Sequence, residues 1–297
     1  MQRGASCKRR RTTSGSTWRV RSGLNRKMTS RYVHGYSELE STRLVDQATT
    51  LTDLLHHDTA YPAGSVVLEA GCGVGAQTVT LARQSPGARI VAVDISKESL
   101  ALARERVASS GADNVEFHHA DLMELPFPPG SFDHVFLCFV LEHLAEPEAV
   151  LRALLRMLRP GGTLTAIEGD HGSAYFHPDH AGARRSIECL VDLQRRHGGD
   201  ALIGRRLFPL LTSVGVDDVR VSPRMVYADG SRPALQDGFT RKTFAAMVEG
   251  VESPAVAAGM MAPQAFREAA LALRRAAEPD GVFCYTFFKA VGLKPVA

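Results

Sequence analysis

The sequence predicts an α/β fold, a doubly wound and mostly parallel sheet with helices on both faces. Apolar, β-branched segments such as Ser65–Ala70 and Ala88–Ile95 alternate with amphipathic segments such as Ala76–Gln84 and Lys97–Gly111. Runs that are apolar throughout are typical of buried parallel strands, and their alternation with helices indicates β-α-β units. The 297 residues, 44% of them hydrophobic and 23% charged, suffice for one elaborated α/β domain or two small ones.

The alternation continues toward the middle of the chain. Further strands are expected at Val115–Asp121, Phe132–Val140 and Gly162–Gly169, with a helix over Glu146–Gly162 that stops at a glycine pair. Ligands of such sheets bind beyond the carboxyl ends of the strands. The residues that follow each strand are therefore the candidates for a functional site.

The last third of the chain has a different pattern. Val216–Asp229 and Gly281–Lys294 alternate like strands, and residues 230–280 between them have a helical pattern. An insert of about 50 residues is far longer than an ordinary strand connection. We expect it to be either a lid over a site or an oligomer contact, so a homodimer is left open. Its large apolar side chains suit an enclosed pocket, a core or a dimer face equally: Phe239, Phe244, Met247, Met260 and Met261.

The N-terminal part of the chain differs from the rest in its charge. Residues 1–28 hold nine Lys/Arg and no acid, which predicts a disordered basic tail, with a mis-assigned start before Met28 as the favoured explanation. Residues 29–60 are expected to form a helical cap, and residues 61–229 with 281–297 the core. Beyond residue 28, 26 basic and 32 acidic residues leave a net charge of −6, which argues against a nucleic-acid-binding surface.

Other features of the composition argue against a membrane protein, a secreted protein and a zinc- or disulfide-stabilised protein. No apolar run approaches the roughly 20 residues that span a bilayer, and no secretory segment is visible, so a cytoplasmic protein without membrane attachment is expected. The five cysteines are odd in number and form no C-x-x-C pair, which indicates buried thiols rather than a disulfide framework or a zinc site.

The segment LEAGCGVGAQT, after the first strand, fits two fingerprints. Gly71, Gly73 and Ala76 match the G-x-G-x-x-G/A pattern of dinucleotide binders. The same segment carries an acid, Glu69, two residues before the first glycine. A carboxylate at the mouth of the loop repels a pyrophosphate and attracts an ammonium group.

The next strand ends add candidate contacts for a nucleoside. Asp94 ends the second strand and is suited to accept hydrogen bonds from both ribose hydroxyls, a role that dinucleotide and nucleoside binders share. Asp121 follows the third strand and is placed to meet an adenine amine, with Leu122 packing on the ring.

Together, LEAGCGVGAQT, VDIS, HADLMELPFPPGSFDHV, FVLEHL and LRPGGTL resemble motifs of the class I S-adenosylmethionine-dependent methyltransferases. The resemblance is close over Tyr61–Gly169 and looser over the terminal strand pair. It is strongest to the small-molecule branch that contains the ubiquinone and menaquinone methyltransferases. It implies a Rossmann-like sheet with an antiparallel terminal strand, S-adenosylmethionine as cofactor and a small-molecule substrate.

The resemblance also implies the cofactor contacts. The methionine part would meet Glu69 and the amides of the glycine loop, and the start of FVLEHL would line the methyl-transfer site. Tyr36, in an element that covers the cofactor in relatives, is either a contact or an aromatic anchor of the helix start. The implied cofactor-binding residues are Tyr36, Glu69, Gly71, Cys72, Gly73, Asp94, Ile95, Asp121, Leu122 and Phe139.

The expected reaction is an in-line displacement by an O, N or C nucleophile held about 3–3.5 Å from the methyl carbon. Glu168 and His171, after the fifth strand, are the candidate catalytic residues because an oxygen or carbon nucleophile gains from a general base. Less favoured acids and bases nearby are Asp170, His177, His180 and His143, and no metal site is expected. Arg205 and Arg206 are either anion contacts or a solvated helix start.

Two rival functions stay open. An NAD(P)-dependent oxidoreductase would use the same glycines and Asp94, although Glu69 and the LRPGG segment count against it. A non-catalytic S-adenosylmethionine-binding protein would keep every cofactor contact. A nucleic-acid methyltransferase is disfavoured, because the Asn/Asp-Pro-Pro-aromatic tetrapeptide is absent from the sequence.

Overall fold

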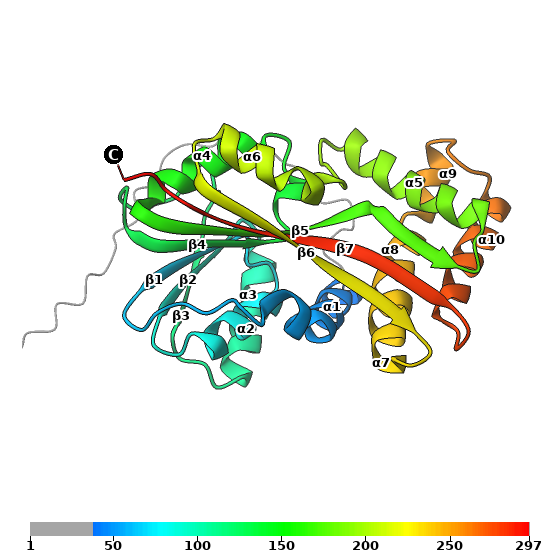
Figure 1. Ribbon diagram of the computed structural model, residues 1–297, viewed down its shortest axis with the longest axis horizontal. Coiled ribbons are helices and arrows are strands. Elements are labelled where there is room, and N and C mark those ends of the chain that lie inside the picture. Colours follow the sequence, from blue (N-terminus) through cyan, green and yellow to red (C-terminus); the bar gives the residue numbers. More distant parts are fainter. Residues whose placement is uncertain (1–37, 297) are drawn as a thin grey trace, which may run out of the picture.

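The computed structural model describes residues 38–296, which form one seven-stranded sheet with helices on both faces (Figure 1). The strand order is β3-β2-β1-β4-β5-β7-β6. Neighbours from β3 to β5 pair in parallel, and β7 runs antiparallel to both β5 and β6. The strands are β1 (Val66–Ala70), β2 (Arg89–Asp94), β3 (Val115–His119), β4 (Phe132–Cys138), β5 (Leu158–His177), β6 (Asp217–Asp229) and β7 (Val282–Leu293).

This order confirms the predicted doubly wound sheet and its antiparallel terminal strand. The chain winds from β1 outward to β3, then returns to β4 on the other side of β1. The crevice between β1 and β4 is therefore the point where the winding direction reverses, and ligands of such sheets bind there.

Helices cover both faces of the parallel part of the sheet (Figure 1). One face is covered by α1 (Glu38–His56), α2 (Ala76–Gln84) and α3 (Lys97–Ser109). The other is covered by α4 (Pro147–Met157) and α6 (Leu207–Ser213), whose leucines pack on the second core cluster. In β2, Ile90 and Ala92 face one layer, and Val91 and Val93 face the other. Burial on both faces explains why the strands are continuous apolar runs.

Strand β5 is much longer than the sequence suggested. A strand ending at Gly169 was expected, but β5 continues to His177 because β7 pairs with it as far as Val282. The pairing shifts register between Asp170 and Tyr175, where the strand is irregular. Beyond the parallel part, β5, β7 and β6 form an antiparallel ribbon that reaches the insert helices (Figure 1).

The insert between β6 and β7 packs on this ribbon. Phe239 and Phe244 of the π-helix η3 are buried against aromatic side chains of β7, and the Phe244 ring centroid lies 4.8 Å from that of Phe283. Met260 and Met261 pack on the same cluster. The apolar side chains of the insert therefore belong to the core. Its helices are α7 (Pro233–Leu235), η3 (Gln236–Ala245), α8 (Ala246–Glu249), α9 (Glu252–Ala257), α10 (Pro263–Arg274) and η4 (Arg275–Ala277).

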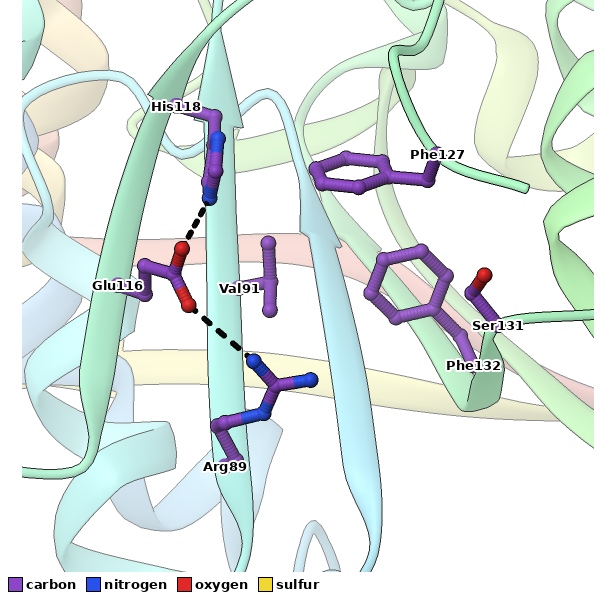
Figure 2. A pocket seen from close by; sticks show the side chains of 7 residues that line it. All are labelled: Arg89, Val91, Glu116, His118, Phe127, Ser131 and Phe132. Atoms are coloured by element: carbon purple, nitrogen blue, oxygen red, sulfur yellow. Dashed lines mark hydrogen bonds and ion pairs between the residues drawn. The ribbon is translucent and has the colours of Figure 1, made fainter. Parts of the chain in front are cut away.

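The connection from β3 to β4, residues 120–131, contains no helix. Phe127 covers the sheet instead, with its ring edge-on to Phe132 and to His118, each at 5.1 Å. A shallow pocket lies beside it, where Glu116 accepts a hydrogen bond from Arg89 at 3.2 Å (Figure 2). This pocket contains none of the predicted site residues. Within residues 38–296, no helix has both the length and the apolar character needed to cross a membrane.

Candidate functional site

The glycine loop after β1 has a backbone that only glycine tolerates at two positions. Gly71 and Gly75 have φ angles of +75° and +76°. A Cβ on Gly71 would lie 2.7 Å from Cγ2 of Val140, and one on Gly75 would lie 2.9 Å from the backbone of Ala103. The glycines thus let β1 turn directly into α2 while the loop contacts the segment after β4.

Asp94, at the end of β2, holds this loop in place. Its carboxylate accepts hydrogen bonds from the backbone N–H groups of Gly73 and Ser96, both at 2.8 Å. Burial raises the pKa of Asp94, and these N–H donors oppose the rise. A carboxylate has about four acceptor sites, so Asp94 retains capacity for ribose hydroxyls.

Glu69 is a buried carboxyl at the base of the loop, only 2% exposed. Burial raises its pKa to about 8, with Thr78 opposing and Asp94 adding to the rise. In the described part of the chain, its Oε2 atom has no hydrogen-bond partner. The N–H groups of Gly71 and Cys72 donate to the Val93 carbonyl, so the unpartnered oxygen of Glu69 is left as a free polar atom of this loop. It fits the ammonium end of an amino-acid ligand, as in S-adenosylmethionine.

The residues assigned to adenine lie at the adjacent strand ends. The Asp121 carboxylate accepts a hydrogen bond from the Met123 N–H at 2.9 Å, and Leu122 packs against the core. Ile95, after Asp94, exposes 56% of its surface, and Met123 is also exposed. Exposed apolar side chains are suited to contact a flat ring. Met123 was missed from the sequence because a single methionine in a loop has no pattern.

The end of β4 turns sharply into the short helix η1 (Leu141–His143). Phe139 adopts the left-handed conformation, with φ +59°, and its N–H donates to the Ile167 carbonyl at 2.9 Å. Such a conformation costs a non-glycine residue about 1–3 kcal/mol, so neighbouring contacts must hold it. The Phe139 ring lies 5.4 Å from that of Phe287, at the position predicted for the methyl-transfer site.

Glu168 stabilises the turn between β4 and η1. Its Oε1 accepts hydrogen bonds from the backbone N–H groups of Val140 at 3.0 Å and Leu141 at 2.8 Å. The side chain is fully buried, and burial together with nearby Glu142 raises its pKa to about 8. The sequence suggested Glu168 as a catalytic residue; these contacts favour a positioning role, and its catalytic role stays a prediction.

His171 lies farther along β5 and is buried against the aromatic cluster. Its Nδ1 is 2.7 Å from the Tyr285 hydroxyl, and its Nε2 is 3.9 Å from Oε2 of Glu142. Burial lowers the pKa of His171, and Glu142 opposes this. The sequence drew attention to His143 in LEHL and missed its neighbour Glu142, which α5 (Ala181–Arg196) contacts through Gln194.

The remaining candidates are engaged elsewhere. Arg205 forms a two-bonded ion pair with Asp170, at 2.7 and 2.8 Å, and Arg206 pairs with Asp200. His180 caps α5 by accepting from the Ala183 N–H, and His177 lies at the far end of β5. Tyr36 lies outside the described residues. Among residues 38–296, no group of three metal-ligating side chains gathers.

Comparison with known proteins identifies relatives of this chain. The family model described as a methyltransferase domain matches residues 68–166. A 27-O-demethylrifamycin SV methyltransferase from Amycolatopsis mediterranei is 36% identical over 54% of this chain and 57% of its own. A demethylmenaquinone methyltransferase from Clavibacter sepedonicus is 42% identical over 36% of this chain and 42% of its own. The chain spans between 34% and 57% of the lengths of the first curated relatives.

Solved structures share the fold. The YcgJ protein from Bacillus subtilis matches with a TM-score of 0.54 at 14% identity, over 84% of this chain and 99% of that chain. The [4+2]-cyclase SpnF matches with a TM-score of 0.52 at 22% identity, over 85% and 81% of the two chains. The methyltransferase-domain match over residues 68–166 and these relatives confirm the resemblance to the class I S-adenosylmethionine-dependent methyltransferases that the sequence motifs carry.

Proposed function

We propose that this protein transfers a methyl group from S-adenosylmethionine to an O, N or C nucleophile of a small molecule by in-line displacement. The observation that carries the proposal is Glu69, a buried carboxyl with an unpartnered oxygen at the base of the glycine loop. A pyrophosphate at this loop would meet a buried acid, whereas an amino-acid ammonium would satisfy it.

The residues of the chain then have separate tasks. Glu69, at the base of the glycine loop, holds the amino-acid end, Asp94 accepts from the ribose, and Asp121 with Leu122 meets the adenine. Phe139 lines the methyl-transfer site, with Tyr36, Cys72 and Ile95 as additional expected contacts. When bound, the cofactor supplies a methyl group already activated on a sulfonium. The protein's part is to align the acceptor and exclude water.

Relatives support a small molecule as acceptor, since those matched in sequence include a 27-O-demethylrifamycin SV methyltransferase and a demethylmenaquinone methyltransferase. The net charge of −6 beyond residue 28 supports the same proposal. A cytoplasmic location remains the expectation from the sequence, and a homodimer remains an open alternative.

A ligand comparison tests the choice of cofactor. S-adenosylhomocysteine is expected to raise the melting temperature of the full chain, and NADPH is expected to leave it unchanged. Glu69→Gln should weaken the effect of S-adenosylhomocysteine, whereas Glu116→Gln, in the shallow pocket of Figure 2, should not. Stabilisation by NADPH alone would overturn the proposal in favour of an oxidoreductase.

A further inference from the structure

Three buried polar atoms around η1 have no hydrogen-bond partner within the part of the chain that the structure describes. They are Oε2 of Glu168, Nε2 of His171 and Oε1 of Gln194. All three side chains are more than nine-tenths buried. Buried polar atoms without a partner are rare in folded proteins, so a cluster of three marks a place where a further polar group binds.

Glu142 lies at the centre of this cluster. Its Oε2 accepts a hydrogen bond from the side-chain amide of Gln194 at 3.1 Å and is 3.9 Å from Nε2 of His171. The second distance is too long for a direct hydrogen bond. An oxygen atom can lie about 2.8 Å from both atoms, a normal hydrogen-bond length. The angle at that oxygen, between Oε2 of Glu142 and Nε2 of His171, is then about 90°. One oxygen atom can therefore bridge the gap between Oε2 of Glu142 and Nε2 of His171 with normal hydrogen-bond geometry.

The groups around the gap determine whether the bridging oxygen donates or accepts hydrogen bonds. Burial opposes ionisation of Glu142, but His143, His171, Gln194 and Arg43 together hold its pKa below the usual value. Burial, Arg43 and His143 lower the pKa of His171, whereas Glu142 and Asp170 raise it, and the net shift is downward. The Glu142 carboxyl thus faces the His171 imidazole across a gap that no direct hydrogen bond closes. The carboxylate favours the tautomer with the proton on Nε2, so the bridging group must both donate and accept.

The gap is close to the loop that would hold the cofactor. Gly71 and Val140 are in close contact, and Glu168 binds Val140 and Leu141 immediately before Glu142. The walls are aromatic, with the Phe244 ring edge-on to His171 at 6.0 Å. An acceptor with a hydroxyl on an apolar or aromatic body fits these surroundings.

We propose that the gap between Oε2 of Glu142 and Nε2 of His171 binds the hydroxyl group of the methyl acceptor, with Glu142 as the general base. This inference rests on the proposed function. The hydroxyl oxygen bonds to the methyl carbon, the carbon–sulfur bond of the sulfonium breaks with its electron pair on sulfur, and the hydroxyl proton passes to Glu142. His171 donates to the oxygen and aligns it, and Tyr285 is a positioning residue because its hydroxyl fixes the His171 ring.

Binding is tested without turnover by nitrogen NMR of histidine-labelled protein, with phenol and toluene as probes. Phenol is expected to shift the imidazole resonances of His171, assigned by their loss in His171→Gln, and toluene is expected not to. Glu142→Gln should abolish the phenol shift, and Tyr285→Phe should change the tautomer of His171. If phenol has no effect or acts like toluene, the gap holds a structural water only and the inference is overturned.

Measurements of kcat test whether Glu142 is the general base. With a phenolic acceptor, Glu142→Gln should lower kcat by about 10²- to 10⁴-fold, the usual contribution of a general base. Its affinity for S-adenosylhomocysteine should stay within about twofold of the wild type. Glu116→Gln is the matched control, because Glu116 also contacts a histidine, His118, at 2.7 Å but lies in the shallow pocket. Unchanged kcat in Glu142→Gln would contradict the inference.

The two proposals fail in different ways. If S-adenosylhomocysteine binds but phenol does not perturb His171, the hydroxyl site is wrong and the proposed function stands. If phenol perturbs His171 but S-adenosylhomocysteine does not bind, the proposed function is wrong and the hydroxyl site stands as a binding site. Melting temperatures of Glu142→Gln and His171→Gln identify any variant that fails to fold.

Discussion

At the scale of single residues, three buried glutamates differ in their hydrogen-bond partners. Glu69, Glu142 and Glu168 are all buried, but their partners differ. Glu168 binds two backbone N–H groups, Glu142 faces Gln194 and two histidines, and Glu69 keeps an unpartnered oxygen. The three roles proposed for these carboxyls, a positioning group for Glu168, a base for Glu142 and a cation contact for Glu69, rest on these different surroundings.

The pKa of Glu69 gives a pH signature. With a pKa of about 8, Glu69 is mostly protonated at pH 7, and an ammonium group of a ligand favours its ionised form. The affinity for S-adenosylhomocysteine should therefore rise as the pH increases from 6 to 8, by up to about tenfold per pH unit, and level off above the pKa. Calorimetry across this range measures the effect. In Glu69→Gln the affinity should be lower and independent of pH; a flat profile in the wild type would argue against a cation at Glu69.

At the scale of elements, an ion-pair network attaches the end of α1 to the β6–β7 pair. Lys289 of β7, with its side chain 4% exposed, donates to Asp58 and Thr59, both at 2.6 Å. Arg224 of β6 also pairs with Asp58, at 2.5 Å. Burial would raise the pKa of Asp58, but these two cations lower it to about 2. The stability from this pairing is present above the unfolded-state pKa near 4 and is lost as the pH falls toward 2.

Two variants of this network should differ in stability. Asp58→Ala leaves the Lys289 ammonium buried without its carboxylate, so it should lower the free energy of unfolding by about 3 kcal/mol. Lys289→Met removes the buried charge, and half-exposed Asp58 keeps Arg224, so a loss below about 1 kcal/mol is expected. Chemical denaturation at pH 7 measures both. A larger loss in Lys289→Met than in Asp58→Ala would contradict this account of the network.

The parallel strands and the glycine loop could be predicted from the sequence because their patterns are local. The extension of β5 could not, since Asp170, Gly172 and Ser173 have the composition of a loop, and the strand continues only because β7 pairs with Asp170 and again from Tyr175 onward. The role proposed for Glu142 could not be read from the sequence for a related reason. Its partners Gln194 and His171 are distant in sequence, and they meet it only through the packing of α5 and β5.

At the scale of the whole molecule, the insert and the sheet share one core. A single cluster of buried residues runs from α1 through β4 to η3 and β7. The insert therefore belongs to the core of residues 38–296, and its Phe244 ring also contacts His171.

This shared core predicts the effect of truncating an insert aromatic. Phe244→Ala should lower the free energy of unfolding by about 3–5 kcal/mol, as is usual for a fully buried phenylalanine. Far- and near-ultraviolet circular dichroism should report one coincident transition. An unchanged melting temperature with a raised KM would instead indicate an independent lid. Phe208→Ala, at a half-exposed position on α6, is the control and should change stability little.

The fold alone does not establish methyl transfer, because the structural neighbours include a protein described as a cyclase. The most direct measurement follows a labelled methyl group from S-adenosylmethionine in the presence of a panel of small molecules carrying hydroxyl, amine or acidic carbon groups. We expect the label on a small molecule, with S-adenosylhomocysteine released in equal amount and the rate greatly reduced in Glu69→Gln. Binding of the cofactor without transfer of label to any member of the panel would contradict the account and indicate a non-catalytic binding protein.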